Sequence, residues 1–323
     1  MKAAYVERFG SEDAFIYGDM PDPKPGPRQV LVRVKAAGIN RGDLFRREGS
    51  YGGAPPKLPF CPGWEVAGVI EAVGAEVKDR TVGQRVAATL ADGGYAELVT
   101  VNRAGTLPIP DGVSFDEASS IPMVFLTSWY ALLKVARLEK GEVALVQSGG
   151  SGVGMAGIQI AKHVGARVFT TAGTDEKVAK CLKLGADAAV NYTKQDFPPE
   201  VMKFTNNTGV NVVLESVGGQ VLLKSIQAMA PLGRLVTVGN SSRGAEKPDM
   251  ETLTRKNCSF TSFSLARQMG YGGVMGEMAK VMDLCAQGKM KSIVDRVFPL
   301  RETAAAHRYL AERKNFGKVV LRP

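Results

Sequence analysis

The sequence lacks the features that mark a membrane or secreted protein. None of its apolar runs approaches the roughly 20 residues that a membrane-spanning helix needs. The first ten residues, MKAAYVERFG, do not contain the apolar region of a secretory signal peptide. The 4 cysteines lie far apart, a spacing that fits reduced thiols rather than a disulfide framework. We therefore expect a cytoplasmic protein without a membrane partner.

Signatures of nucleic-acid binding are missing as well. Lys and Arg outnumber Asp and Glu by 41 to 32, which gives a formal net charge of +9. The basic residues are nevertheless spread along the chain, and no zinc-finger or RNA-binding pattern occurs. We expect no nucleic-acid partner. The excess positive charge would instead help to attract an anionic cofactor.

The length of 323 residues suggests about two domains, and two textures follow one another along the chain. Residues 1 to about 110 contain short strand-like runs, such as 29–36, 65–73, 85–89 and 95–101, which are typical of a compact barrel or sandwich. A helical pattern covers 125–135. From Glu142 onward strands alternate with helices, which indicates a doubly wound parallel sheet. The last strand-like run of that series is 259–265.

A glycine cluster between two strand-like runs organises the second half. The stretch 142–173 is consistent with strand, tight turn, helix and strand, with Gly149, Gly152 and Gly154 in the turn. Such glycines let the backbone approach a pyrophosphate, which would lie at the N-terminus of the helix that begins near Gly152. Ser151 stands where the strict G-x-G-x-x-G pattern has a glycine. The alternative is a glycine-rich turn without a ligand.

The end of the next strand bears on the choice of nucleotide. An NAD site usually carries an acidic residue there, whereas this strand ends in Thr171-Ala172-Gly173. Lys177 and Tyr192 follow, and ammonium and phenol groups suit a 2′-phosphate. Asp175 and Glu176 count against this assignment, although we expect them to cap the following helix. We predict NADPH rather than NADH.

Seven short motifs are spread along nearly the whole chain. They are AGINRGD at 37–43, the segment 47–51, PGWEVAGVI at 62–70, GGYAE at 93–97, FLTSW at 125–129, GNSS at 239–242 and GKVV at 317–320. Together they resemble the zinc-free quinone oxidoreductase (zeta-crystallin-like) branch of the medium-chain dehydrogenase/reductase superfamily.

The resemblance implies an α/β fold with a GroES-like, β-barrel-type catalytic domain and an inserted Rossmann domain with a doubly wound parallel sheet. We expect the catalytic domain to comprise 1–121 and 266–323, and the Rossmann domain to comprise 122–265. Relatives commonly form homodimers, and the strand-like run 259–265 could pair across a two-fold axis.

The resemblance also bears on metal binding. Zinc-dependent members use a Cys/His/Glu-type catalytic set. Trp64 replaces the histidine of their Gly-His-Glu motif, and the position near Asn40 that holds their cysteine has no cysteine. The only histidines, His163 and His307, fall in predicted helices. We therefore expect no metal.

Residue roles follow from the same resemblance. Asn40 and Thr127 would lie near the nicotinamide, while the remaining cofactor-binding residues would line the NADPH track: Gly149, Ser151, Gly152, Val153, Gly173, Lys177, Tyr192, Ser216, Gly239, Asn240 and Ser241. Tyr51 matches a tyrosine thought to be a proton donor in related enoyl reductases, and the alternative is a stacking or gating aromatic. Arg47 could steer an anionic substrate or form a salt bridge with Asp43, and we expect the salt bridge. For Cys61 we expect a buried thiol without a catalytic role.

The implied activity is reduction of a quinone or an activated alkene (enal or enone) by NADPH, with Tyr51 and Asn40 as catalytic candidates. Two alternatives stay open. One is an enoyl-thioester (CoA) reductase of the same superfamily. The other is a non-catalytic NADPH-binding protein, like the relatives that serve as crystallins or bind RNA.

Overall fold

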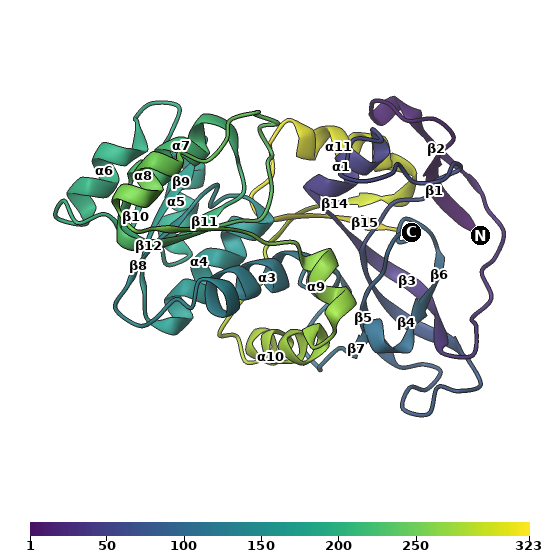
Figure 1. Ribbon diagram of the computed structural model, residues 1–323. Helices are drawn as coiled ribbons and strands as arrows, with labels where there is room; N and C mark the ends of the chain where they lie inside the picture. The colour runs from purple at the N-terminus through teal and green to yellow at the C-terminus, as the bar shows by residue number, and fades with distance from the viewer. The chain divides into compact units, whose positions relative to one another are not determined.

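The computed structural model describes residues 1–270 and 272–323, and the chain divides into two compact units (Figure 1). The first unit comprises Met1–Met123 and Gly272–Pro323, and the second comprises Val124–Tyr271. We keep 121/122 and 265/266 as the proposed domain boundaries. Within the described residues, no helix is both long and apolar enough to cross a lipid bilayer.

The first unit is built on a seven-stranded sheet with the order β14-β15-β3-β4-β5-β7, in which β6 also pairs with β3. A separate two-stranded sheet joins β1 to β2. The strands of this unit are β1 (Lys2–Val6), β2 (Phe15–Asp19), β3 (Gln29–Ile39), β4 (Glu65–Val73), β5 (Arg85–Thr89), β6 (Leu98–Asn102), β7 (Thr106–Pro108), β14 (Val294–Pro299) and β15 (Lys318–Arg322). Its helices are η1 (Glu12–Ala14), α1 (Arg41–Arg47), η2 (Arg103–Gly105), α2 (Phe115–Ser119), α10 (Val274–Ala286), η4 (Leu300–Glu302) and α11 (Thr303–Ala311); the adjoining α3 begins at Pro122.

Strand β3 is central to this unit because it pairs with β4, β6 and β15. Its first half alternates, with Val30, Val32 and Val34 buried and Arg33 and Lys35 exposed. Its last four residues are all buried, and the chain then enters α1 at Asn40. The sheet core thus fixes where Asn40 lies.

The second unit contains a six-stranded parallel sheet with the order β10-β9-β8-β11-β12-β13. Its strands are β8 (Val143–Val146), β9 (Arg167–Ala172), β10 (Ala188–Asn191), β11 (Val210–Glu215), β12 (Met229–Thr237) and β13 (Ser259–Ser262). Its helices are α3 (Pro122–Trp129), the π-helix η3 (Tyr130–Val135), α4 (Gly152–Val164), α5 (Asp175–Lys183), α6 (Phe197–Phe204), α7 (Gly219–Gln227), α8 (Met250–Arg255) and α9 (Leu265–Tyr271). Figure 1 shows α4 to α8 packed around this sheet.

The strand order of the second unit creates a switch point beside β8. From β8 the chain adds β9 and β10 on one side, and it returns to add β11, β12 and β13 on the other. In such sheets ligands bind outside the carboxyl ends of the strands at the reversal. The glycine turn after β8 and the loop after β11 both lie at this edge.

The predicted α/β architecture is confirmed, and several element boundaries differ from the predictions. The helix expected at 125–135 begins at Pro122 and continues as the π-helix η3 from Tyr130. The strand expected at 95–101 begins only at Leu98, because Ala96 instead forms an isolated bridge to Ala3. The strand expected at 259–265 ends at Ser262, since α9 begins at Leu265.

A buried polar chain links α1 to α11 in the first unit. Arg47 donates to Nδ1 of His307 (3.3 Å), and Nε2 of His307 lies 3.4 Å from the Tyr95 hydroxyl. Arginine can only donate, so Nδ1 must be unprotonated and Nε2 carries the proton. Burial, and then the Arg47 charge, hold the pKa of His307 well below its ordinary value. His307 is therefore neutral in the folded protein.

The predicted salt bridge between Arg47 and Asp43 is wrong, because Arg47 has other partners. The Arg47 guanidinium pairs with Glu48 (2.9 Å) and with Glu12 (4.0 Å), and it donates to the Gly10 carbonyl oxygen. The pairing at i, i+4 fails because α11 brings a histidine against the guanidinium. Arg47 is 2% exposed, which leaves it no role in steering a substrate.

The neutral His307 makes stability depend on pH. An unfolded chain protonates this histidine below pH ~6.5, whereas the folded protein resists protonation, so the stability that neutral His307 contributes is present above that pH and is lost as the pH falls. We predict that the wild type loses up to about 1.4 kcal/mol per pH unit relative to His307→Gln below pH 6.5. Denaturant unfolding of both proteins between pH 7.5 and 5 checks this. A constant difference across that range contradicts it.

Candidate functional site

The glycine turn after β8 is shaped for close backbone approach. Ser148 adopts φ of 55°, and a Cβ added to Gly149 would collide with Oγ1 of Thr170. A Cβ on Gly154 would collide with the Ser148 carbonyl oxygen. Bulkier residues at 149 and 154 would therefore force the turn open.

Ser151 is the N-cap of α4, which explains why a serine interrupts the glycine pattern. Its hydroxyl accepts a hydrogen bond from the Gly154 N–H (3.0 Å). Helix geometry leaves the N–H groups of Gly152 and Val153 without intrahelical acceptors, so they are available to an anion. From α3, the Ser128 hydroxyl donates to the Val153 carbonyl oxygen (2.8 Å) at this helix end. The neighbouring Thr127 lies on the same helix.

The ends of β9 and β10 bring Gly173 and Tyr192 together, and Lys177 lies in the first turn of α5. A Cβ on Gly173 would lie 2.9 Å from the Tyr192 hydroxyl, so the phenol packs directly on this glycine. Tyr192 is 41% exposed. The Thr174 hydroxyl caps α5 by accepting a hydrogen bond from the backbone N–H of Lys177 (3.2 Å). Lys177 therefore lies in the first turn of that helix.

The two carboxylates near this loop have cationic partners. Asp175 accepts from the Asn191 amide (2.7 Å) and from Lys194 (2.5 Å), and both interactions lower its pKa. Glu176 pairs with Lys180 four residues later. The predicted capping by Asp175 and Glu176 is wrong, because Thr174 supplies the cap. Their charges are nevertheless partly neutralised.

A buried carboxylate that could not be identified from the sequence motifs holds the loop after β11, and a backbone hydrogen bond joins that loop to the loop after β12. Glu215 accepts from the N–H groups of Val217 and Gly218, and burial raises its pKa. The Ser241 N–H donates to the Ser216 carbonyl oxygen (3.2 Å). An acidic residue that ends the apolar run 210–214 was the available signal.

Asn240, beside Gly239, is committed to its own loop. Its amide nitrogen donates to the Gly244 carbonyl oxygen (2.7 Å), and its oxygen accepts from the Ser242 hydroxyl (3.1 Å). The loop also packs on Gly218, where any Cβ would collide with this amide. The Asn240 side chain therefore stabilises its own loop.

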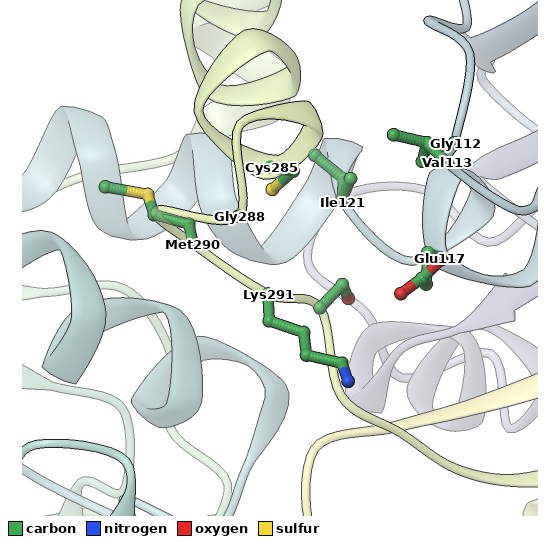
Figure 2. A pocket seen from close by; sticks show the side chains of 9 residues that line it. Gly112, Val113, Glu117, Ile121, Cys285, Gly288, Met290 and Lys291 are labelled. Carbon is green, nitrogen blue, oxygen red and sulfur yellow. The ribbon is translucent and has the colours of Figure 1, made fainter.

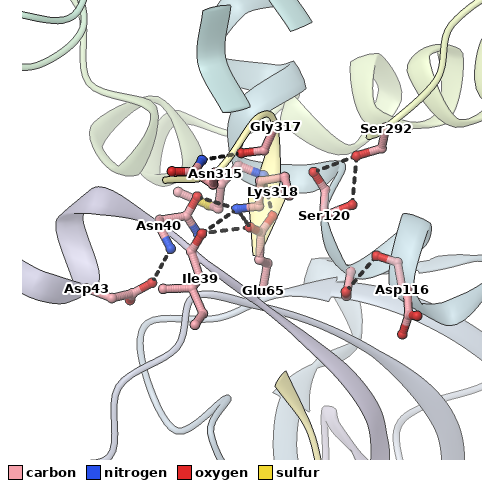
Figure 3. Close-up of polar contacts among 12 residues, drawn as sticks. Ile39, Asn40, Asp43, Glu65, Asp116, Ser120, Ser292, Asn315, Gly317 and Lys318 are labelled. Atoms are coloured by element: carbon pink, nitrogen blue, oxygen red, sulfur yellow. Dashed lines mark hydrogen bonds and ion pairs between the residues drawn. The ribbon is translucent and has the colours of Figure 1, made fainter. Parts of the chain in front are cut away.

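In the first unit, Asn40 belongs to a network around a buried ammonium (Figure 3). Lys318 donates to the Ile39 carbonyl oxygen (2.8 Å), to Oδ1 of Asn40 (2.8 Å) and to Oε1 of Glu65 (2.7 Å). Asn40 donates from Nδ2 to the same carboxylate oxygen (2.8 Å). The side chains of Lys318 and Glu65 are 2% and 0% exposed.

Neighbouring groups complete this network. Oε2 of Glu65 accepts from the Met123 N–H (2.7 Å). A Cβ added to Gly38 would lie 2.5 Å from Oε1 of Glu65, so a side chain at position 38 would collide with this carboxylate. Asp43 accepts from the Asn40 N–H (2.8 Å). Burial raises the pKa of Asp43 to about 6, although the Asn40 N–H and the Lys318 charge oppose the rise. The sequence analysis did not identify Lys318 or Glu65 as site residues.

Tyr51 belongs to an aromatic cluster near the start of α1. Its ring centroid lies 5.1 Å from that of Trp64, and the Arg46 guanidinium lies 5.7 Å from the Trp64 ring. A Cβ on Gly42 would collide with the indole. Tyr51 is 43% exposed, and partial burial followed by the Asp43 charge raises its pKa, so its phenol is a weaker acid than usual.

The donor set does not fit a catalytic zinc ion. Among residues 1–270 and 272–323, no group of three or more His, Cys, Asp or Glu side chains could hold a metal ion. His163 is exposed, and both ring nitrogens of His307 have partners in the buried chain. Burial raises the pKa of the Cys61 thiol to about 12, and its sulfur contacts the Tyr95 carbonyl oxygen.

A separate cavity of about 210 Å³ lies in the first unit (Figure 2). Its lining includes Glu117, Cys285, Met290 and Lys291. Burial and the Glu117 charge raise the pKa of Cys285 to about 12, so the sulfur remains a thiol. No residue predicted as a site residue lines this cavity.

The turn geometry predicts a contrast between two helical glycines. In Gly154→Ala the new methyl group collides with backbone, and we expect the free energy of unfolding to fall by about 1–3 kcal/mol. The matched control is Gly276→Ala in α10, where a Cβ meets no atom within 4 Å and better helix propensity should add up to about 1 kcal/mol. Urea unfolding measures both. Equal effects would show that the turn is not constrained as described.

Comparison with known proteins places this chain in a family. Residues 26–111 match the alcohol dehydrogenase GroES-like domain, and residues 152–287 match the zinc-binding dehydrogenase family. The Pseudomonas aeruginosa quinone oxidoreductase is 33% identical over 318 residues, with 98% of this chain and 97% of that protein covered. A 2-haloacrylate reductase from Burkholderia is 32% identical, with 99% and 98% covered.

Structural similarity agrees. Escherichia coli quinone oxidoreductase, solved in complex with NADPH, has a TM-score of 0.93 at 29% identity, with 100% of both chains covered. The chain is also 32% identical to part of a phenolphthiocerol/phthiocerol polyketide synthase from Mycobacterium tuberculosis, where the match covers 98% of this chain and spans only 14% of the relative's length. The chain thus belongs to the medium-chain dehydrogenase/reductase superfamily, in the branch that includes the quinone oxidoreductases.

Proposed function

We propose that the protein is a cytoplasmic, NADPH-dependent oxidoreductase that transfers hydride to a quinone or an activated alkene without a metal ion. The observation that carries the proposal is the Ser151-capped glycine turn next to a β9 end that lacks an acidic residue. The relatives named for quinone and 2-haloacrylate reduction support this class of acceptor.

The second unit offers groups that fit a phosphorylated dinucleotide. The turn holds Gly149 and Gly154 where side chains would collide, and the N–H groups of Gly152 and Val153 would hold the pyrophosphate. The loops after β11 and β12 contain Ser216, Gly239, Asn240 and Ser241. We propose that these residues line the same ligand, with Thr127. When bound, the reduced nicotinamide supplies the hydride.

Lys177 and Tyr192 would hold the 2′-phosphate that distinguishes NADPH from NADH. Tyr192 packs on Gly173, and Lys177 lies in the first turn of the helix that follows. Of the two neighbouring carboxylates, Asp175 pairs with Lys194 and Glu176 pairs with Lys180. A charge-assisted hydrogen bond of this kind contributes roughly 1.5–3 kcal/mol, or about 10- to 100-fold in affinity.

The first unit would act on the acceptor. Asn40 and Tyr51 remain the proposed catalytic residues. The raised pKa of Tyr51 favours a stacking role, because a weaker acid is a poorer proton donor. Trp64 stands where zinc-dependent members have a histidine, which supports chemistry without zinc. We also keep a homodimer formed through the edge strand β13 as a proposal.

The activity is tested directly with purified protein. We expect oxidation of NADPH, followed at 340 nm, to be accelerated by 1,4-benzoquinone or by an acyclic enone and to saturate with acceptor. A parallel series with crotonyl-CoA separates free acceptors from thioesters. Binding of NADPH without turnover on any acceptor would reject the enzyme and favour a non-catalytic binding protein.

Cofactor selectivity is tested in α5. We expect Lys177→Ala to weaken NADPH binding about 10- to 100-fold while NADH binding stays unchanged, because only NADPH carries the 2′-phosphate. Lys183→Ala, an exposed lysine at the far end of the same helix, is the control for net charge. Calorimetric titration gives both affinities. If the NADPH-to-NADH ratio is the same in both variants, Lys177 does not bind the phosphate.

A further inference from the structure

The contacts of Lys318 and Glu65 assign the polarity of the Asn40 side chain. Lysine has only donors, so the Asn40 atom 2.8 Å from its ammonium must be the amide oxygen. The other amide atom lies 2.8 Å from Glu65, whose carboxylate accepts from Lys318 as well, so that atom must be the nitrogen. The amide therefore cannot flip without opposing a donor to a donor and an acceptor to an acceptor.

This arrangement leaves one polar hydrogen of Asn40 for other partners. The amide nitrogen has two N–H bonds, and Glu65 is its only acceptor in the contacts of the described residues. Asn40 is half-buried, whereas Lys318 and Glu65 are buried. An ammonium on the amide oxygen also polarises the amide and strengthens its remaining N–H as a donor.

Each of the proposed acceptors develops negative charge on oxygen. Hydride addition to the β-carbon of an enone moves an electron pair onto the carbonyl oxygen and gives an enolate, and hydride addition to a quinone gives a hydroquinone monoanion. One proton from solvent completes either product. A fixed N–H donor aimed at such an oxygen stabilises the transition state more than the ground state.

Resting on the proposed function, we propose that Asn40 is a hydrogen-bond donor to the acceptor's developing oxyanion, and that Lys318 and Glu65 are positioning residues that keep its amide in the donor orientation. Lys318 does not itself reach the acceptor, since three acceptors take up its three N–H bonds. In this proposal a neutral amide stabilises the oxyanion, and a buried ion pair orients that amide.

The test reverses the polarity while keeping the charge. In the double variant Asn40→Asp with Glu65→Gln, the carboxylate moves to position 40, where Lys318 donates to it. Because one oxygen of Glu65 accepts from both Lys318 and Asn40 in the wild type, Lys318 gives up its hydrogen bond to position 65 when the new amide donates to position 40. The total charge is unchanged, but residue 40 presents only acceptors. Asn40→Ala is the comparison, because it removes the donor and leaves the Lys318–Glu65 pair intact.

We expect both variants to lose about 10²- to 10³-fold in kcat when NADPH is saturating, as on removal of an oxyanion-hole donor. The polarity swap should do no better than Asn40→Ala. Circular dichroism and thermal unfolding confirm that each variant is folded. A swap variant with kcat within roughly threefold of wild type, or a loss confined to NADPH affinity, would overturn the proposal.

A binding probe separates this inference from the activity itself. 4-Nitrophenolate carries a fixed oxyanion and needs no turnover, and its binding is followed by absorbance at a pH where it is ionised. We expect wild type to bind it at least about tenfold more tightly than either variant, whether or not NADPH is oxidised. Equal phenolate affinity in the three proteins would contradict the donor role even in an active enzyme.

Discussion

The first unit depends on a buried ion pair that must remain complete. Lys318 and Glu65 are almost without solvent contact, and desolvating two charges costs several kcal/mol for each ion. The structure offsets this cost with the Ile39 carbonyl, the Asn40 amide and the Met123 N–H, which satisfy the remaining donors and acceptors. Such a pair adds little net stability, but the loss of either partner is expensive. It therefore fixes geometry, and the side chain that it fixes at the surface is Asn40.

The second unit follows a different rule at the carboxyl edge of its sheet. Each of three loops at this edge is stabilised by its own polar side chain: Ser151 caps α4, Thr174 caps α5 and Glu215 holds the loop after β11. None of these groups depends on a bound ligand for its hydrogen bonds. The loops are therefore shaped in advance, and the energy of binding a dinucleotide would not be spent on ordering them.

Local sequence patterns predicted the helices and strands well, but they did not predict contacts between residues that are distant in the sequence. The alternation in β3 and the glycine turn before α4 were readable because their partners lie within a few residues. The ammonium of Lys318 reaches Glu65 across more than 250 positions, and no periodicity in the run 317–321 indicates that its lysine points inward. The Arg47 interpretation failed for the same reason, since His307 comes from α11. The site residues taken from the family resemblance remain proposals.

We propose that this protein stabilises the acceptor's developing oxyanion with an amide held by a buried ion pair, where zinc-dependent members of its superfamily use a metal. Elemental analysis of the purified protein, combined with turnover before and after exhaustive dialysis against a chelator, tests this most directly. We expect substoichiometric zinc and a kcat that the chelator leaves unchanged. One zinc ion per chain, whose removal abolishes turnover and whose return restores it, would contradict this proposal.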